Sequence, residues 1–212
     1  MKKTKTTTLA ALLAAAWLSG SAWAAGIADV TGTYSVTFQP LTSAGQLKGC
    51  SLIYNVMMLD YVYQNGAPVL AVGNITYNQS ELHPGLSLKL GLSNVLGGAR
   101  TAVPPHYAFI RTKTGTTAGT KFVSYDSDVS GYRIFVYQFT EKSVRVLEDL
   151  LEGQNPTIGF NRNENGVDAT FQVDLAVEDI AESSPGNIQR KRSTAAIEGF
   201  VGCFSELAAA LK

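Results

Sequence analysis

The chain has 212 residues, with 17 basic side chains against 17 acidic ones. A hydrophobic share of 45% and a charged share of 16% exclude a largely disordered chain, which would carry fewer apolar residues and more net charge. Since positive charge is not in excess, the composition gives no basis for nucleic acid as a partner.

The first 24 residues have the pattern of a secretory signal peptide. Three lysines precede an apolar run over residues 9–18, and small residues lead to a cleavage site predicted after Ala24. That run is shorter than the ~20 apolar residues of a membrane-spanning helix, and no later stretch approaches this length. We therefore expect residues 25–212 to form a single β-rich domain without a transmembrane segment. The lysine-rich start and alanine-rich core suggest a periplasmic or secreted protein of a Gram-negative bacterium.

Two cysteines occur in the chain, Cys50 and Cys203. An exported protein meets oxidising conditions, so we predict that they form a disulfide bond. The bond would close a loop of about 150 residues, for which the chain-entropy model gives about 5 kcal/mol as an upper figure. Zinc binding is not supported by the spacing, and no histidine lies near either cysteine in sequence. We expect neither a metal nor a cofactor.

Alternating apolar and polar residues predict strands through most of the chain. Residues 50–63 are apolar on both faces and predict a long central strand, which ends at the turn pair Asn65-Gly66. In chain order, the predicted strands cover residues 33–38, 50–63, 69–77, 86–93, 106–113, 121–125, 132–139, 157–161 and 167–177. Residues 182–191 are predicted to form a loop, since Ser, Pro and Gly are frequent there.

Two segments change to the helical period. Residues 143–152 have apolar residues at helical spacing and stop before Gly153, a typical left-handed residue after a helix. Residues 193–211 predict a C-terminal helix that Ser193 or Thr194 could cap. Its apolar face comprises Ile197, Val201, Phe204, Leu207 and Leu211.

Together these elements predict a mainly β fold. We expect an antiparallel β-sandwich or a partly closed barrel of about nine strands, with one short helix and a C-terminal helix pinned by the disulfide. Cys203 lies within the apolar part of the C-terminal helix, so the bond would hold that helix against the long central strand at Cys50.

Two short stretches, residues 126–131 and 161–166, have oxygen-bearing side chains at alternate positions before a glycine. This pattern resembles the start of a calcium-binding loop. A calcium loop has an acidic residue at its twelfth position, but this position is Tyr137 in the first stretch and Gln172 in the second. Because each stretch also separates two predicted strands, we interpret both as turns.

Common catalytic motifs are missing from the sequence: it contains no G-x-S-x-G, S-x-x-K, H-E-x-x-H or Walker A pattern. Three residues are candidates for acid–base chemistry, namely Asp60, His83 and His106. Asp60 follows an apolar run, yet a buried acid at the end of a strand is more often hydrogen-bonded to the backbone. We therefore assign no catalytic residue.

Tyrosines are abundant in and beside the predicted strands. Each offers a rigid apolar ring and a polar tip, so a group of them could form a recognition surface. The candidate ligand-binding residues are Tyr54, Tyr61, Tyr63 and Tyr77. The alternative is that these side chains complete a sheet, which agrees with the strand propensity of tyrosine.

These observations favour an exported, non-catalytic protein that binds an envelope component or another protein. Three alternatives stay open. The first is a structural subunit that exchanges an edge strand, with residues 30–38 as the exchanging segment. The second is a carrier of a small apolar ligand. The third is a hydrolase of unknown class.

Overall fold

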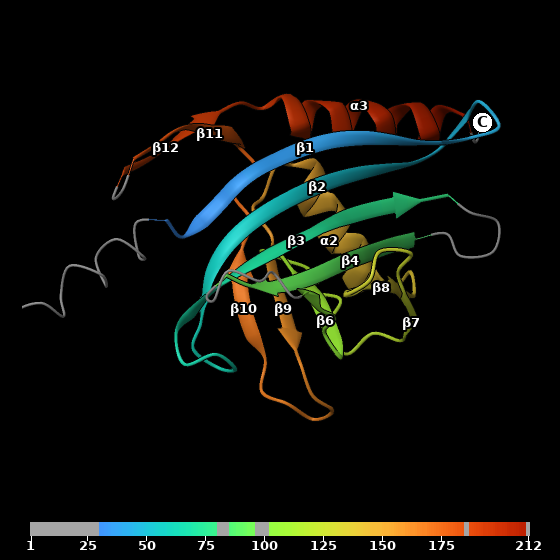
Figure 1. The fold of residues 1–212 in the computed structure, drawn as a ribbon. Helices are drawn as coiled ribbons and strands as arrows, with labels where there is room; N and C mark the ends of the chain where they lie inside the picture. Colours follow the sequence, from blue (N-terminus) through green and yellow to red (C-terminus); the bar gives the residue numbers. More distant parts are fainter. Residues whose placement is uncertain (1–29, 80–84, 96–101, 185–186, 211–212) are drawn as a thin grey trace, which may run out of the picture.

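The computed structural model describes residues 30–79, 85–95, 102–184 and 187–210, so the predicted signal peptide and His83 lie outside the described residues. Within these ranges the chain forms three antiparallel sheets and two α-helices, which confirms the mainly β fold (Figure 1). The largest sheet is open and not closed into a barrel, because its path ends at β1 (Gly32–Ser43) on one side and at β7 (Phe122–Asp126) on the other.

Seven strands build the large sheet in the spatial order β1-β2-β3-β4-β8-β7, with β5 added to β4. Its other members are β2 (Gln46–Asp60), β3 (Ala67–Asn78), β4 (Gly85–Asn94), β5 (Ala102–Val103) and β8 (Tyr132–Tyr137). The predicted turn between β2 and β3 is confirmed, since Asn65 and Gly66 have φ angles of 51° and 82°. However, β2 ends at Asp60, so the predicted strand over residues 50–63 was three residues too long.

The second sheet has three strands in the order β10-β9-β6, formed by β10 (Ala169–Gln172), β9 (Thr157–Asn161) and β6 (Tyr107–Arg111). Here the prediction of one strand over residues 167–177 was wrong. The chain leaves the sheet after Gln172, because the Asp174 carboxylate accepts a hydrogen bond from the Ala176 N–H and folds the backbone into a turn.

A two-stranded sheet joins β11 (Val177–Ser184) to β12 (Asn187–Arg192). The predicted loop over residues 182–191 was therefore wrong. Composition pointed to a loop, but pairing between the strands satisfies the backbone that a loop would expose to water. An exposed ion pair between Lys191 and Glu178, at 3.0 Å, also links the two strands.

Helix α2 (Glu141–Leu151) follows the predicted segment closely. It begins with a capping box, in which Thr140 accepts from the Ser143 N–H and the Ser143 hydroxyl accepts from the Thr140 N–H. It ends before Gly153, whose φ of 76° confirms the predicted left-handed position. The buried side chains of α2 include Val146 and Leu150, which belong to the core between the sheets.

Helix α3 (Ala195–Ala209) runs along β1 and β2 (Figure 1). Its buried side chains are Phe200, Cys203 and Leu207, so the helix is rotated relative to the predicted apolar face. Gly199 explains part of this orientation: a Cβ atom there would lie 2.5 Å from the Phe38 ring, and the glycine lets α3 approach β1 closely. The predicted disulfide between Cys50 of β2 and Cys203 of α3 is confirmed.

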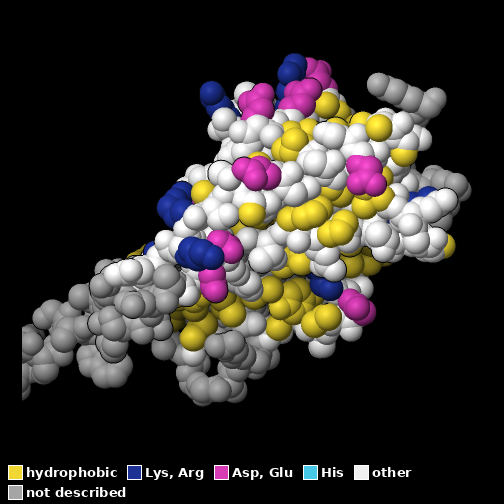
Figure 2. All heavy atoms as spheres, turned by 90° about the horizontal axis from the view of Figure 1, so that it is seen from above, with side chains coloured by type: hydrophobic (Ala, Val, Ile, Leu, Met, Phe, Trp, Pro, Cys, Tyr) yellow, Lys and Arg dark blue, Asp and Glu magenta, His cyan; other side chains and the backbone are white. Residues whose placement is uncertain are grey.

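Charged side chains do not gather by sign on the face shown in Figure 2. There, basic and acidic groups lie next to one another, with hydrophobic side chains exposed between them. This distribution agrees with the balanced charge of the sequence.

Asp149 ties α2 to the loop between β6 and β7. Its Oδ2 atom accepts hydrogen bonds from the backbone N–H and the hydroxyl of Thr114, at 2.7 and 2.9 Å. Burial opposes the charged form, but hydrogen bonds from Thr112, Thr114 and Gly115 outweigh it and hold the pKa of Asp149 below its ordinary value.

We expect Asp149→Asn to lower the free energy of unfolding by about 1 kcal/mol at pH 7, because the amide keeps an acceptor but loses the charge. A depressed folded-state pKa stabilises the protein above the unfolded-state value of about 4, and this contribution disappears as the pH falls through the folded-state pKa. Urea unfolding of both proteins between pH 7 and pH 2 should show their stabilities converging in acid. A difference that stays constant over this range would contradict the assignment.

Candidate functional site

The structure does not bring the four candidate tyrosines onto one surface. Tyr54 is 1% exposed and contacts Phe171 in the core, with the ring centroids 6.1 Å apart. Tyr77 packs against Phe204 of α3, with the ring centroids 5.1 Å apart. Both therefore contribute to the packing between the large sheet and its neighbours.

Tyr61 and Tyr63 lie in the turn between β2 and β3. Tyr61 is 73% exposed, whereas the Tyr63 ring stacks on Phe160 and its hydroxyl donates to the backbone oxygen of Val167. This contact ties the β2–β3 turn to the loop between β9 and β10. Of the four candidates, only Tyr61 presents most of its side chain to solvent, and its role in binding stays a prediction.

Asp60 is the last residue of β2, and its side chain is buried. Its Oδ1 atom accepts from the backbone N–H groups of Val62 and Tyr63, at 3.1 and 2.8 Å, and its Oδ2 atom lies 3.0 Å from the Arg162 guanidinium. Both oxygens are thus bonded within the protein, which agrees with the interpretation of Asp60 as a strand-end residue. The side chain of His106 is exposed, while its backbone N–H donates to the oxygen of Asn161.

The two calcium-like stretches are turns, as predicted: one joins β7 to β8 and the other joins β9 to β10. In the first turn, Asp126 pairs with Arg133 at 3.0 Å and Asp128 pairs with Lys89 at 3.2 Å. Cations of the chain itself therefore occupy the carboxylates. Among the described residues, no group of three or more His, Cys, Asp or Glu side chains could hold a metal ion.

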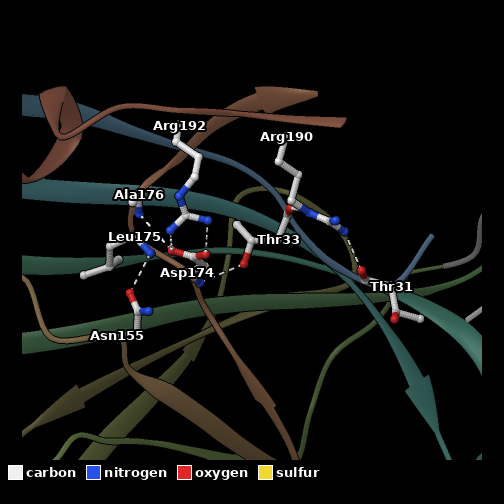
Figure 3. A network of polar contacts seen from close by, with 8 residues as sticks. All are labelled: Thr31, Thr33, Asn155, Asp174, Leu175, Ala176, Arg190 and Arg192. Atoms are coloured by element: carbon white, nitrogen blue, oxygen red, sulfur yellow. Dashed lines mark hydrogen bonds and ion pairs between the residues drawn. The ribbon is translucent and has the colours of Figure 1, made fainter. Parts of the chain in front are cut away.

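A polar network fastens the start of β1 to the β11–β12 hairpin (Figure 3). Arg190 donates to the backbone oxygens of Thr31 and Thr33, and Arg192 forms a two-pronged ion pair with Asp174 at 2.8 and 3.1 Å. The Asp174 N–H in turn donates to the Thr33 hydroxyl at 2.8 Å. A groove of about 570 Å³ lies beside these residues. Because both arginines bond to the protein, we interpret the network as a structural link.

Strand β7 differs from the rest of the sheet because all five of its residues are exposed. Phe122, Val123 and Tyr125 are 40, 47 and 43% exposed. The strand pairs with β8 on one side, and no strand among the described residues pairs with its other side. It contains no proline, and its single charged residue is Asp126 at the end. The usual features that protect an edge strand from pairing with another chain are therefore few here.

The register shows which backbone groups of β7 point outward. The N–H groups of Gln138 and Ser127 form ladder bonds between the strands, to the oxygens of Lys121 and Tyr132 respectively. Since bonding alternates along an antiparallel pair, the odd-numbered residues of β7 bond to β8. The N–H and C=O groups of Phe122, Ser124 and Asp126 consequently point away from the sheet.

Side chains on the two faces of β7 have different surroundings. Phe122 faces the core, where its ring lies near Phe135 and Tyr137 at centroid distances of 5.9 and 6.5 Å. Val123 and Tyr125 stand on the opposite face, next to the half-buried Val136 and Ile134 of β8. This outer apolar strip, defined as Val123, Tyr125, Ile134 and Val136, continues the exposed edge onto the surface of the sheet.

The opposite edge of the large sheet is covered over the first part of β1, whereas several residues from Thr37 on are exposed. Arg190 bonds to backbone oxygens at the start of β1, and β1 also contacts β11 and α3. Val36 in its middle is 2% exposed. Sequence alternation predicted the strand at residues 121–125, but its edge position could not be read from the segment, because that depends on which strands fold beside β8.

A comparison of this chain with protein-family models, curated proteins and solved structures found no match. Within the described ranges, none of the helices combines the length and apolar character that crossing a bilayer requires.

Proposed function

We propose that this protein is an exported, non-catalytic binding protein that holds another polypeptide by adding an extended segment of it to β7. The observation that carries the proposal is the row of outward-pointing backbone groups at Phe122, Ser124 and Asp126 on an exposed strand. Strand addition uses such groups for affinity and uses alternate side chains for specificity. The outer apolar strip supplies a surface for the side chains of the added strand.

Export is supported by the disulfide, which forms and persists in oxidising compartments. The carrier alternative has less support, since two surface grooves, of about 640 and 570 Å³, are open and mix polar with apolar lining residues. For strand exchange, the observations favour β7 as an acceptor over residues 30–38 as a donor, because β1 is paired with β2 and partly buried.

The test uses Ser124→Pro, because proline removes an outward N–H and leaves the ladder bonds to β8 in place. A photoreactive amino acid at Val123 should cross-link a partner in the envelope fraction, and Ser124→Pro should reduce that product at least tenfold. The matched control is Ser124→Ala, which keeps the N–H and should cross-link like the unmodified chain. Thermal unfolding would verify that both variants are folded.

A second photoreactive position, Gln39 on the exposed part of β1, serves as the control for location. Equal cross-linking from Val123 and Gln39, or a product that survives Ser124→Pro in a folded protein, would overturn the proposal.

A further inference from the structure

The charged residues at the two ends of β7 are arranged so that a second, antiparallel copy of the strand would be complementary to the first. Lys121 stands just before the strand, whereas Asp126 and Asp128, which pair with Arg133 and Lys89 of the same chain, stand at and beyond its far end. Residues 122–125 are uncharged. Two identical strands that run antiparallel bring the basic end of each next to the acidic end of the other. A two-fold axis through the middle of the strand, at Ser124, produces this arrangement.

The hydrogen-bonding pattern permits the same arrangement. With Ser124 opposite Ser124 of a second copy, Phe122 faces Asp126 of that copy, and every one of these residues has outward-pointing N–H and C=O groups. About six backbone hydrogen bonds would then join the two strands over their full length. Other registers that keep outward groups opposite each other overlap over fewer residues.

Side chains also match in this register. Val123 comes to lie opposite Tyr125 of the second copy on the outer face, at a position where antiparallel partners are closest. Pairs of β-branched and aromatic residues stabilise antiparallel strands. The outer apolar strips of the two copies would meet across the axis and form one continuous apolar surface.

We infer that the polypeptide added to β7 is a second copy of this chain, paired antiparallel with Ser124 on the two-fold axis. This inference rests on the proposed function and names its partner. It joins the two large sheets into one continuous sheet across the dimer. The contact is isologous, so it closes after two copies and does not propagate into a fibre.

Cross-linking through an introduced cysteine tests the register. Two Ser124→Cys side chains would be directly opposite each other, with Cα atoms about 5.5 Å apart, within the range that a disulfide bridges. Under mild oxidation we expect most Ser124→Cys protein to become a covalent dimer. In the matched control Val123→Cys, the new cysteine faces Tyr125 of the second copy, and the yield of covalent dimer should be at least tenfold lower. Equal yields from both variants would overturn the register, and a Ser124→Cys protein that stays monomeric would overturn the inference.

Amide hydrogen exchange separates this inference from the proposed function. The sample is purified protein of residues 25–212 at rising concentration. The N–H groups of Phe122, Ser124 and Asp126 should become protected from exchange as sedimentation shows that the dimer forms. Ser124→Pro should abolish both the protection and the dimer. If the purified protein is monomeric and these groups become protected only with envelope extract, the second copy is wrong and a different polypeptide partner stands. If they exchange freely in both conditions, the proposed function also falls.

Discussion

Reducing the Cys50–Cys203 disulfide should lower the free energy of unfolding by about 4 kcal/mol. The two cysteines are 153 residues apart, and cross-links that close long loops restrict the unfolded chain most in the chain-entropy model. A typical domain has a net stability of only 5–15 kcal/mol, so the loss should bring the protein close to its unfolding threshold.

Urea unfolding of the oxidised and reduced forms of the same chain measures this effect without changing a side chain. The variant Cys50→Ala/Cys203→Ala is the second measurement, and it should be at least as destabilised as the reduced protein, because Cys50 is fully buried. A reduced protein within 1 kcal/mol of the oxidised one would show that the loop model fails here.

The second large effect is expected at the ion pair between Asp60 and Arg162, whose side chains are 0 and 9% exposed. Arg162→Met leaves the Asp60 carboxylate buried without its cation, and Asp60→Asn leaves the guanidinium without its anion. Each single change should cost about 3–5 kcal/mol, since the desolvation of the remaining charge is no longer offset.

The double variant Asp60→Asn/Arg162→Met should be more stable than the sum of the two losses predicts, by about 2 kcal/mol or more. The Arg162 Nε atom has no hydrogen-bond partner among the described residues, so the cation is costly even in the native pair. Urea unfolding of all four proteins gives the coupling energy.

The exposed pair Arg145 and Glu148 is the matched control, and the same cycle there should give a coupling energy of less than about 0.5 kcal/mol. Similar coupling at both pairs would contradict the role of burial.

Local chemistry decided which parts of the fold were predictable. The Asn65-Gly66 turn, the Gly153 helix end and most strands follow from backbone preferences and alternation within a few residues. The disulfide followed from the presence of two cysteines in a chain that was predicted to be exported. Apart from the disulfide, these features need no knowledge of distant neighbours.

Features that depend on distant neighbours were missed. The β11–β12 hairpin has a loop-like composition, and the orientation of α3 is set by Gly199 against Phe38 and by the disulfide. The candidate site belongs to this second group. Its strand was predicted, but the exposure of β7 arises because β8 receives β4 on one side and nothing in the described chain lies beyond β7.

The wide separation of the two cysteines also sets an order of events during biosynthesis. Cys50 leaves the ribosome 153 residues ahead of Cys203, so all twelve described strands have been synthesised before the covalent link can close. The meander from β1 to β4 is built from strands adjacent in sequence, so its pairing does not require the covalent link. Oxidation is therefore a step that only the completed chain can undergo, and it joins the last helix to the second strand.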